Sequence, residues 1–288
     1  MDILPQLVAN SIIAGALYAV ITLGFNLIYT TTRFIDISYG AIAVVGGYGV
    51  FFLSKKLGLD LAISIPLAVI FAGALGFIVD RFVYSKLRAR KASNMIILIA
   101  SLGVFTVLQA IVAILFSSQF QTLSALAGET RTFEIWGGVI TDIQLVMLIS
   151  GLLIFLVLAF LLKKTMFGKA LRAVSDDVEV AKIVGINTDK IIGKVVFLGS
   201  AIAGLAGIFI GFDTGIEPTM GMALLLKGVV ASIIGGIGNI YGGIVGAFLL
   251  GFVENFGIWQ ISGEWKDAIA FGVLILFLLF RPNGILRR

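Results

Sequence analysis

Seven long runs without any charged residue constrain this chain more than any other feature. They are Pro5 to Thr32, Ile37 to Ser54, Leu61 to Val79, Ala92 to Gly128, Ile143 to Leu162, Val195 to Phe212 and Gly228 to Val253. A helix needs roughly 20 apolar residues to cross a bilayer, and each run approaches or exceeds that length. Only 13% of the residues are charged, against about 25% in soluble domains. The sequence therefore predicts an all-α, polytopic membrane protein forming a single transmembrane domain over residues 1–288.

The residue types that are absent exclude most enzyme mechanisms. The chain contains no cysteine and no histidine, which removes thiol nucleophiles, disulfides, Cys/His metal sites and Ser-His-Asp triads. Neither Gly168-Lys169 nor Gly193-Lys194 is followed by Ser or Thr, so no phosphate-binding loop of the P-loop type is present. We therefore expect no enzyme activity, no bound cofactor or metal, and no nucleic-acid partner.

Basic side chains gather in three segments, and these indicate the topology. The net charge is +5, and the clusters lie in residues 81–91, 163–190 and 281–288. Loops rich in Lys and Arg face the cytoplasm. The stretch from Ser117 to Asp142, with Glu129 inside it, is predicted to face outward.

The C-terminal part of the topology follows from the same rule. Asp213 and Glu217 are predicted to face outward and Arg281 inward, which requires an odd number of crossings between them. Three short passes fit: one ending near Gly235, one starting near Gly242, and one over residues 266–280. The total is eight or nine segments in the inner membrane, with a cytoplasmic C-terminus.

The segment from Ile37 to Leu53 has two interpretations. Its four glycines are compatible with a spanning helix or with a re-entrant piece that returns to the side it entered from. Lys55 and Lys56 follow it directly, and they fit the charge rule poorly if they lie outside.

Glycine, with 35 residues, recurs at spacings that allow close helix packing. Gly207 and Gly211, and also Gly242 and Gly246, are four residues apart. In addition, residues 41–49 and 230–238 share one glycine pattern, and short glycine-interrupted segments often mark a transport pathway. This match has two interpretations: an internal repeat, or a coincidence in a glycine-rich chain.

The segment of about 164–190 has the pattern of two short amphipathic helices between membrane spans. Asp176 is expected to cap the second helix, with Glu179 at its third position and Gly185 as its left-handed stop. An exposed apolar stripe requires a partner, and we favour docking of a cytoplasmic protein over a helix lying on lipid. Asn187, Thr188 or Asp189 is expected to cap the next span. The candidate docking residues are Gly168, Arg172, Asp176, Glu179, Val180, Ile183, Val184, Gly185 and Asn187.

Ionisable residues inside a membrane are costly and are therefore functional candidates. Lys227 and Glu254 have this position, although snorkelling to an interface also explains them. Arg33 and Asp36 are interpreted either as an interfacial pair or as part of a pathway. The candidate pathway residues are Arg33, Asp36, Tyr39, Gly40, Lys227, Gly235, Gly236, Gly238 and Glu254.

The order and spacing of several motifs resemble one family, the shorter of the two paired permeases of branched-chain amino-acid ABC importers. The motifs are Gly15-Ala-Leu-Tyr-Ala19, Leu23-Gly-Phe-Asn-Leu-Ile-Tyr29, Lys182-Ile-Val-Gly-Ile-Asn187, Gly235-Gly-Ile-Gly238 and Arg281-Pro-Asn-Gly-Ile285. One departure is Asp36-Ile-Ser-Tyr-Gly40, where family members usually carry Asn-Phe-Ala-His-Gly. Related importers of this group carry urea or short amides, so these remain alternative substrates.

The resemblance implies a helical inner-membrane subunit that pairs with a second permease, either a different chain or a copy of itself. It further implies two cytoplasmic ATPases that bind the ATP, an extracytoplasmic substrate-binding protein, and docking of the ATPases through residues 168–187. Two rival functions fit the sequence less well. A self-sufficient channel or secondary transporter leaves the docking stripe unexplained, and an intramembrane enzyme lacks a positioned acid, base or nucleophile.

Overall fold

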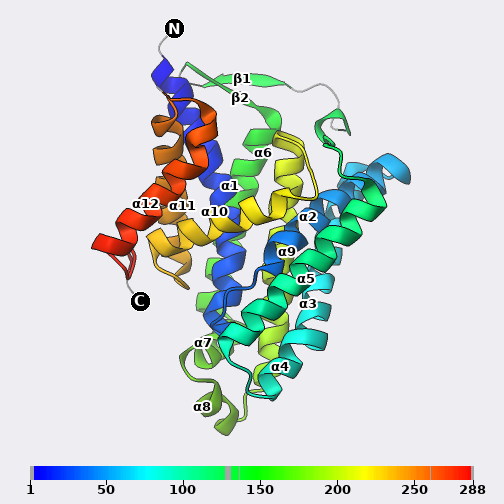
Figure 1. Ribbon diagram of the computed structural model, residues 1–288, viewed down its shortest axis with the longest axis vertical. Helices are drawn as coiled ribbons and strands as arrows, with labels where there is room; N and C mark the ends of the chain where they lie inside the picture. Colours follow the sequence, from blue (N-terminus) through cyan, green and yellow to red (C-terminus); the bar gives the residue numbers. More distant parts are fainter. Residues whose placement is uncertain (1–2, 127–130, 136, 260, 287–288) are drawn as a thin grey trace.

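The computed structural model describes residues 3–126, 131–135, 137–259 and 261–286 (Figure 1). The sequence-based expectations for Glu129, Arg287 and Arg288 lie outside the described residues. Helices make up most of the described chain, which confirms the predicted all-α class.

The N-terminal half contains α1 (Ile3–Thr32), α2 (Ser38–Val50) with the π-helical turn η1 (Phe51–Lys56), α3 (Leu61–Val79) with η2 (Asp80–Tyr84), α4 (Ser85–Ala89) and α5 (Asn94–Phe116). The short helix η3 (Ser124–Leu126) and strands β1 (Thr132–Ile135) and β2 (Gly138–Thr141) follow. The C-terminal half contains α6 (Asp142–Lys164), α7 (Met166–Asp176), α8 (Val178–Ile183), α9 (Thr188–Asp213), α10 (Met220–Gly235), α11 (Ile240–Gly257), η4 (Gly263–Trp265) and α12 (Lys266–Phe280).

Among the described residues, six helical segments are long and apolar enough to cross a membrane: α1, α3 through α4, α5, α6, α9 and α11. Three further apolar helices, α2, α10 and α12, are shorter. The bounds of α10, α11 and α12 agree with the three short C-terminal passes that the sequence predicts. α10 ends at Gly235, α11 begins at Ile240, and α12 covers Lys266–Phe280. The antiparallel hairpin of β1 and β2 was not predicted.

The long helices divide into a buried centre and an apolar periphery. α1 and α9 are mostly buried, whereas α5 and α6 expose most of their side chains. α1 packs against α11, α9, α10 and α6, and α9 packs against α3 and α2. The exposed side chains of α5 and α6 are largely aliphatic, as expected for surfaces that face hydrocarbon.

Glycines allow the central helices to approach closely. A Cβ added to Gly24 on α1 would lie 2.8 Å from the Gly199 carbonyl oxygen on α9, and one added to Gly199 would lie 2.9 Å from the Gly24 oxygen. Gly242 and Gly246 likewise leave no room beside α10. The four-residue glycine spacing therefore serves helix packing, as predicted.

The molecule has two distinct ends. Figure 1 shows α4, α7 and α8 together at the lower end, with the hairpin and the start of α1 at the upper end. The segment from Ile37 to Leu53 is a continuous helix that passes from α2 into η1. The matching glycine runs differ locally, because residues 46–49 are helical whereas Gly236 and Gly238 have positive φ angles in a break between helices.

Candidate functional site

An ionic group joins α1, α10, α11 and α12, and it extends from the buried Glu254 to the exposed Asp267. We call it the Lys227 cluster: Tyr18, Lys227, Glu254, Lys266 and Asp267. The Lys227 ammonium lies between Glu254 Oε1 and Asp267 Oδ1, the latter at 2.8 Å. The Tyr18 hydroxyl donates to Glu254 Oε2 at 2.6 Å, and Lys266 Nζ lies 3.9 Å from that oxygen. The cluster thus holds two cations and two carboxylates.

Glu254 is the centre of this cluster. Its side chain is completely buried near the end of α11, so it does not snorkel to an interface. A buried carboxylate is tolerated only with a close counter-charge and hydrogen bonds. Lys227 on α10 and Tyr18 on α1 supply both, and together they tie three helices to one side chain.

A cavity of about 380 Å³, lined by both apolar and polar side chains, adjoins the cluster between α1, α6, α9, α10, α11 and α12. Lys227 and Lys266 line it together with Asp213 and Asn255. Gln144 Nε2 donates to Asp213 Oδ1 at 3.0 Å, which orients that carboxylate. Ammonium and carboxylate groups in one cavity provide partners for both charged ends of a zwitterion.

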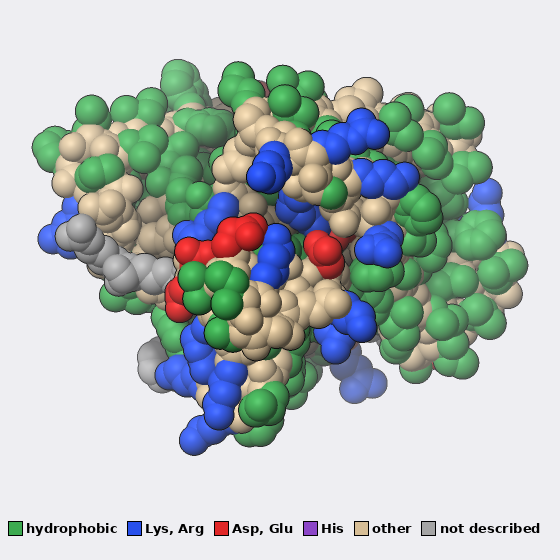
Figure 2. Space-filling model, turned by 90° about the horizontal axis from the view of Figure 1, so that it is seen from below, with side chains coloured by type: hydrophobic (Ala, Val, Ile, Leu, Met, Phe, Trp, Pro, Cys, Tyr) green, Lys and Arg blue, Asp and Glu red, His purple; other side chains and the backbone are tan. Residues whose placement is uncertain are grey.

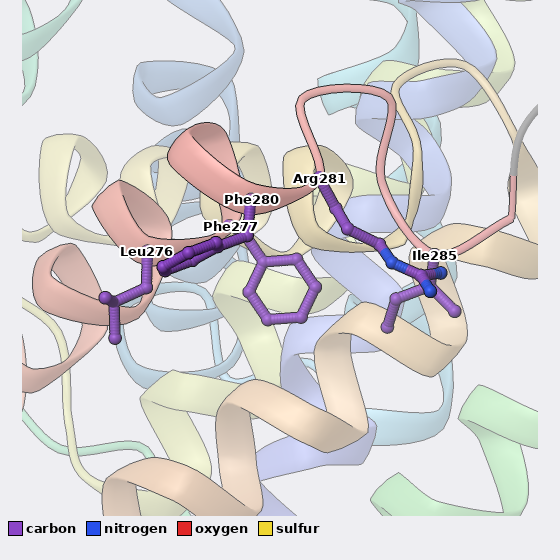
Figure 3. Close-up of a pocket in the computed structure, with 5 residues that line it drawn as sticks. All are labelled: Leu276, Phe277, Phe280, Arg281 and Ile285. Carbon is purple, nitrogen blue, oxygen red and sulfur yellow. The ribbon is translucent and has the colours of Figure 1, made fainter.

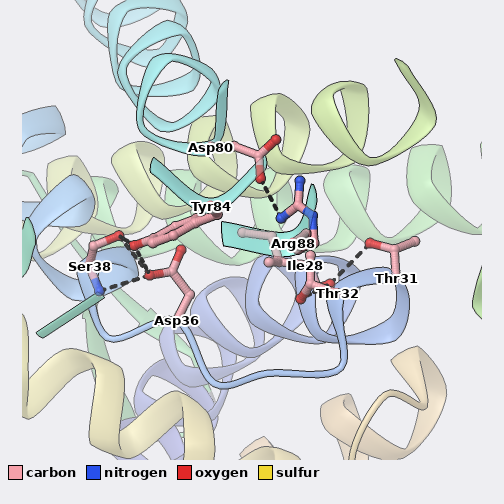
Figure 4. Close-up of polar contacts among 8 residues, drawn as sticks. All are labelled: Ile28, Thr31, Thr32, Asp36, Ser38, Asp80, Tyr84 and Arg88. Atoms are coloured by element: carbon pink, nitrogen blue, oxygen red, sulfur yellow. Dashed lines mark hydrogen bonds and ion pairs between the residues drawn. The ribbon is translucent and has the colours of Figure 1, made fainter. Parts of the chain in front are cut away.

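A second polar group lies at the lower end, where α1 turns into α2 (Figure 4). Asp36 Oδ1 accepts hydrogen bonds from the Ser38 amide at 3.0 Å, the Ser38 hydroxyl at 2.6 Å and the Tyr84 hydroxyl at 2.8 Å. The nearby pair of Arg88 and Asp80 is 2.8 Å apart. Burial raises the pKa of Asp36 above its usual range, and the hydrogen bonds from Ser38 and Tyr84 oppose this shift.

Arg33 and Asp36 do not pair with each other. Arg33, in the left-handed region with φ 58°, donates from its guanidinium to the Ser175 carbonyl oxygen of α7 at 2.7 Å. The proposed interfacial pair is therefore wrong, since each residue has other partners. Tyr39 is buried and donates to the Ile21 oxygen at 2.8 Å.

The glycine break between α10 and α11 is closed by α1 and by the C-terminal segment. Asn26 on α1 accepts from the Gly238 amide at 2.9 Å and donates to the Asn239 oxygen at 3.2 Å. The Leu286 amide donates to the Gly235 oxygen at 3.0 Å. Gly235, Gly236 and Gly238 are all buried, so they fill a packed junction.

The C-terminal segment also borders a hollow at the end of α12. Figure 3 shows the Phe280 and Arg281 side chains beside it, with Ile285 returning on its far side. Its volume is about 300 Å³, and its lining is almost entirely apolar. It therefore lacks the paired polar groups of the cavity beside Lys227.

The segment between α6 and α9 forms the two predicted amphipathic helices. Thr165 caps α7 by accepting from the Gly168 amide at 3.1 Å. The cap of α8 is Asp177, which accepts from the Glu179 and Val180 amides at 2.8 and 3.0 Å. The prediction of Asp176 as this cap is wrong, because Asp176 is still the last residue of α7.

Other local signals in this segment are confirmed. Gly185 ends α8 with φ 85°, and Asn187 caps α9 by accepting from the Lys190 amide at 3.0 Å. Arg172 donates to the Leu162 carbonyl oxygen and so ties α7 to the end of α6.

The apolar stripe of α8 faces away from the protein. Val180, Ile183 and Val184 are 54%, 83% and 67% exposed, whereas Leu171 and Val174 of α7 are buried in the core. Figure 2 shows this end from below, with many Lys and Arg side chains around a smaller group of acidic and hydrophobic ones. We call Val180, Ile183 and Val184 the α8 stripe.

The predicted pathway residues therefore occupy separate places. Lys227 and Glu254 are bonded to each other, whereas Arg33 and Asp36 lie in the linker between α1 and α2, where Arg33 contacts α7. Gly40 packs against the backbone of Gly221. The sequence analysis did not single out four residues that bind these candidates or the glycine break: Tyr18, Asn26, Tyr84 and Asp267. For Asn26 the sequence did contain a signal, because a polar amide inside a long apolar run is expected to form a hydrogen bond with another helix.

Comparison with known proteins identifies the family. Residues 7–278 match the family described as branched-chain amino acid transport system / permease component. The chain is 32% identical to the high-affinity branched-chain amino acid transport system permease protein BraD of Pseudomonas aeruginosa, covering 99% of this chain and 96% of that one. It is also 32% identical to the corresponding permease protein LivH of Escherichia coli (strain K12), covering 98% and 95%.

The fold has a counterpart among solved structures. PsaBC from Streptococcus pneumoniae in complex with Fab aligns with a TM-score of 0.53 and 16% identity, covering 98% of this chain and 93% of that one. At this identity the match concerns the fold alone. The family match and the six apolar helices indicate that the protein is a membrane-embedded transport component and not an enzyme. The chain thus belongs to the permease components of branched-chain amino acid transport systems.

Proposed function

We propose that this chain is the permease subunit of an ABC importer that moves branched-chain amino acids across the inner membrane. Separate ATPase subunits bind the ATP and drive the movement, and the chain itself needs no cofactor. Its further partners are a second permease and an extracytoplasmic binding protein. Its relatives are branched-chain amino acid permeases, which supports this substrate class.

The observation that carries the proposal is the α8 stripe. Three adjacent apolar side chains project from a two-turn helix that is held by caps at both ends. A patch of this kind is a site for protein contact. The preceding helix, α7, is bonded to Arg33 at the junction of α1 and α2. A movement of α8 is therefore transmitted through α7 and Arg33 to the membrane helices α1 and α2.

The proposed orientation puts α4, α7 and α8 in the cytoplasm, because the basic residues gather there. The N-terminus then lies outside. With α2 and η1 counted as one pass, nine passes alternate along the chain and the C-terminus lies inside. The lysines at positions 55 and 56 then lie at the outer end.

Solute entry is assigned to the cavity beside the Lys227 cluster. Lys227 and Lys266 offer ammonium groups to a substrate carboxylate, and Asp213 offers a carboxylate to a substrate ammonium. The apolar walls contributed by Ile13 and Leu17 suit an aliphatic side chain. Urea has neither a carboxylate nor an ammonium group, so it forms fewer favourable contacts in this cavity.

We also propose an inverted repeat that relates α1 and α2 to α9 and α10. Gly24 on α1 and Gly199 on α9 pack reciprocally against each other's carbonyl oxygens, and Gly40 on α2 and Gly221 on α10 do the same. α1 starts at the upper end and α9 next to α8 at the lower end, so they run in opposite directions (Figure 1). Inverted repeats allow one half of a transporter to rock against the other.

The docking role is tested by purification in mild detergent. Val180→Asp, Ile183→Asp and Val184→Asp together should release the ATPase subunits, because a charged stripe cannot be buried in an interface. Val139→Asp is the control, since Val139 is 49% exposed on the hairpin at the other end. Retention of the ATPases by the triple variant would refute the assignment.

The substrate is tested by uptake of labelled leucine in cells, with isoleucine, valine and urea as competitors. Competition by the two amino acids and none by urea is expected. Stronger competition by urea than by valine would favour the alternative substrate class.

A further inference from the structure

An apolar groove of about 740 Å³ lies between α3 and α5, with α2 and η1 as its floor. Leu67 and Leu75 of α3 face Leu108 and Val112 of α5 across it. Besides Lys56 and Tyr48, its lining consists of apolar side chains and one glycine. No substrate role is assigned to this groove, which is separate from the cavity beside the Lys227 cluster.

Tyr48 lies in the floor of the groove, but its hydroxyl is not open to the groove. Its side chain is 1% exposed, and its hydroxyl has no hydrogen-bond partner among the described residues. A buried hydroxyl without a partner is costly. The Tyr48 ring lies 5.0 Å from the Phe116 ring at the end of α5. The hydroxyl therefore belongs to the packed floor, and the polar groups that an occupant can reach are the lysines of η1.

Two lysines stand at the same end of the groove. Lys55 Nζ lies 4.9 Å from the centre of the Phe51 ring, and Lys56 Nζ lies 5.5 Å from that of Phe116. Neither ammonium forms an ion pair within the described parts of the chain. The nearest acid along the chain, Asp60, is engaged in capping α3. The groove therefore has two available cations at its mouth.

We propose that this groove binds one anionic phospholipid. An acyl chain lies between α3 and α5, and the phosphate lies between Lys55 and Lys56. The order along the groove, apolar and then ammonium, matches the order of tail and head in a phospholipid. The exposed side chains at its rim, Phe71 and Leu115, are apolar and face hydrocarbon. Lysines near a membrane surface attract anionic headgroups, which accounts for two lysines at the end opposite the main basic face.

The test is lipid titration by native mass spectrometry on the full chain with whatever subunits accompany it, using phosphatidylglycerol and phosphatidylcholine. Wild type should retain one phosphatidylglycerol through delipidation and bind it more tightly than phosphatidylcholine. Lys55→Gln with Lys56→Gln should weaken phosphatidylglycerol binding by about 30-fold. Tyr48→Phe should leave the binding of both lipids unchanged, because the Tyr48 hydroxyl is not open to the groove.

The control is Lys86→Gln with Lys91→Gln, which removes the same charge at the other end and should leave binding at this site unchanged. Leu115→Trp, which fills the rim, should reduce retention of both lipids and provides a second variant if the lysine variant is poorly produced. Equal binding of the two lipids by wild type, together with unchanged binding by the lysine variant, would overturn the proposal. Cross-linking of position 115 to a partner permease in the assembled complex would also overturn it, because a protein helix would then occupy the groove.

Discussion

Lys227→Met and Glu254→Gln should have unequal effects, although each breaks the same ion pair. Lys227→Met leaves the buried Glu254 carboxylate with the Tyr18 hydroxyl and with Lys266 at 3.9 Å. Glu254→Gln leaves Lys227 with Asp267 at 2.8 Å. The first change strands a buried charge and the second does not.

The size of the effect follows from this difference. Removing one partner of a buried ion pair costs about 3 to 5 kcal/mol, so Lys227→Met should lower the Tm on the order of 10 °C. Glu254→Gln should cost less than half as much. The double variant should be more stable than Lys227→Met alone, because it contains no stranded carboxylate.

The assay is thermal unfolding of the purified chain in mild detergent, followed by intrinsic fluorescence. Lys182→Met is the matched control, since Lys182 and Glu179 form an exposed ion pair whose loss costs about 0.5 kcal/mol. A Lys227→Met variant as stable as Lys182→Met would refute the reasoning. A double variant less stable than Lys227→Met would also refute it.

Three further predictions concern coupling, packing and pH. Arg33→Ala should reduce uptake while ATP hydrolysis continues, because it removes a charge-assisted bond to α7 that is worth about 1.5 to 3 kcal/mol; parallel uptake and hydrolysis assays check this. Gly207→Ala should lower the Tm, because its Cβ would overlap the Ala43 carbonyl oxygen, whereas Gly103→Ala meets open space and should not. Asp36 lies in the linker after α1, and its raised pKa means that its ionisation destabilises the fold. Stability should therefore fall as the pH rises from about 4 through the raised pKa, and Asp36→Asn should abolish this fall in thermal unfolding.

Features encoded by neighbouring residues could be read from the sequence. The apolar runs predicted the long helices, and the charge rule applied to Glu217 and Arg281 predicted three passes where α10, α11 and α12 lie. Gly185 and Asn187 were correct as a stop and a cap, because each acts on residues within one turn. The error at Asp176 arose because two adjacent aspartates carry the same capping signal and differ only in backbone angles.

Contacts between distant segments could not be read in the same way. Tyr18 and Glu254 are 236 positions apart, and nothing local to either residue indicates the other. The same holds for Asn26 and the glycine break, where α1 supplies hydrogen bonds that the break lacks. Arg33 and Asp36 were paired because they are close in sequence, but the turn after α1 directs them to α7 and η2.

The most direct test of the central claim is leucine transport in vesicles that contain the purified chain with or without its proposed partner subunits. The account predicts accumulation of leucine against its gradient only when the ATPase subunits and ATP are both present. Such accumulation by the chain alone, without nucleotide, would contradict it.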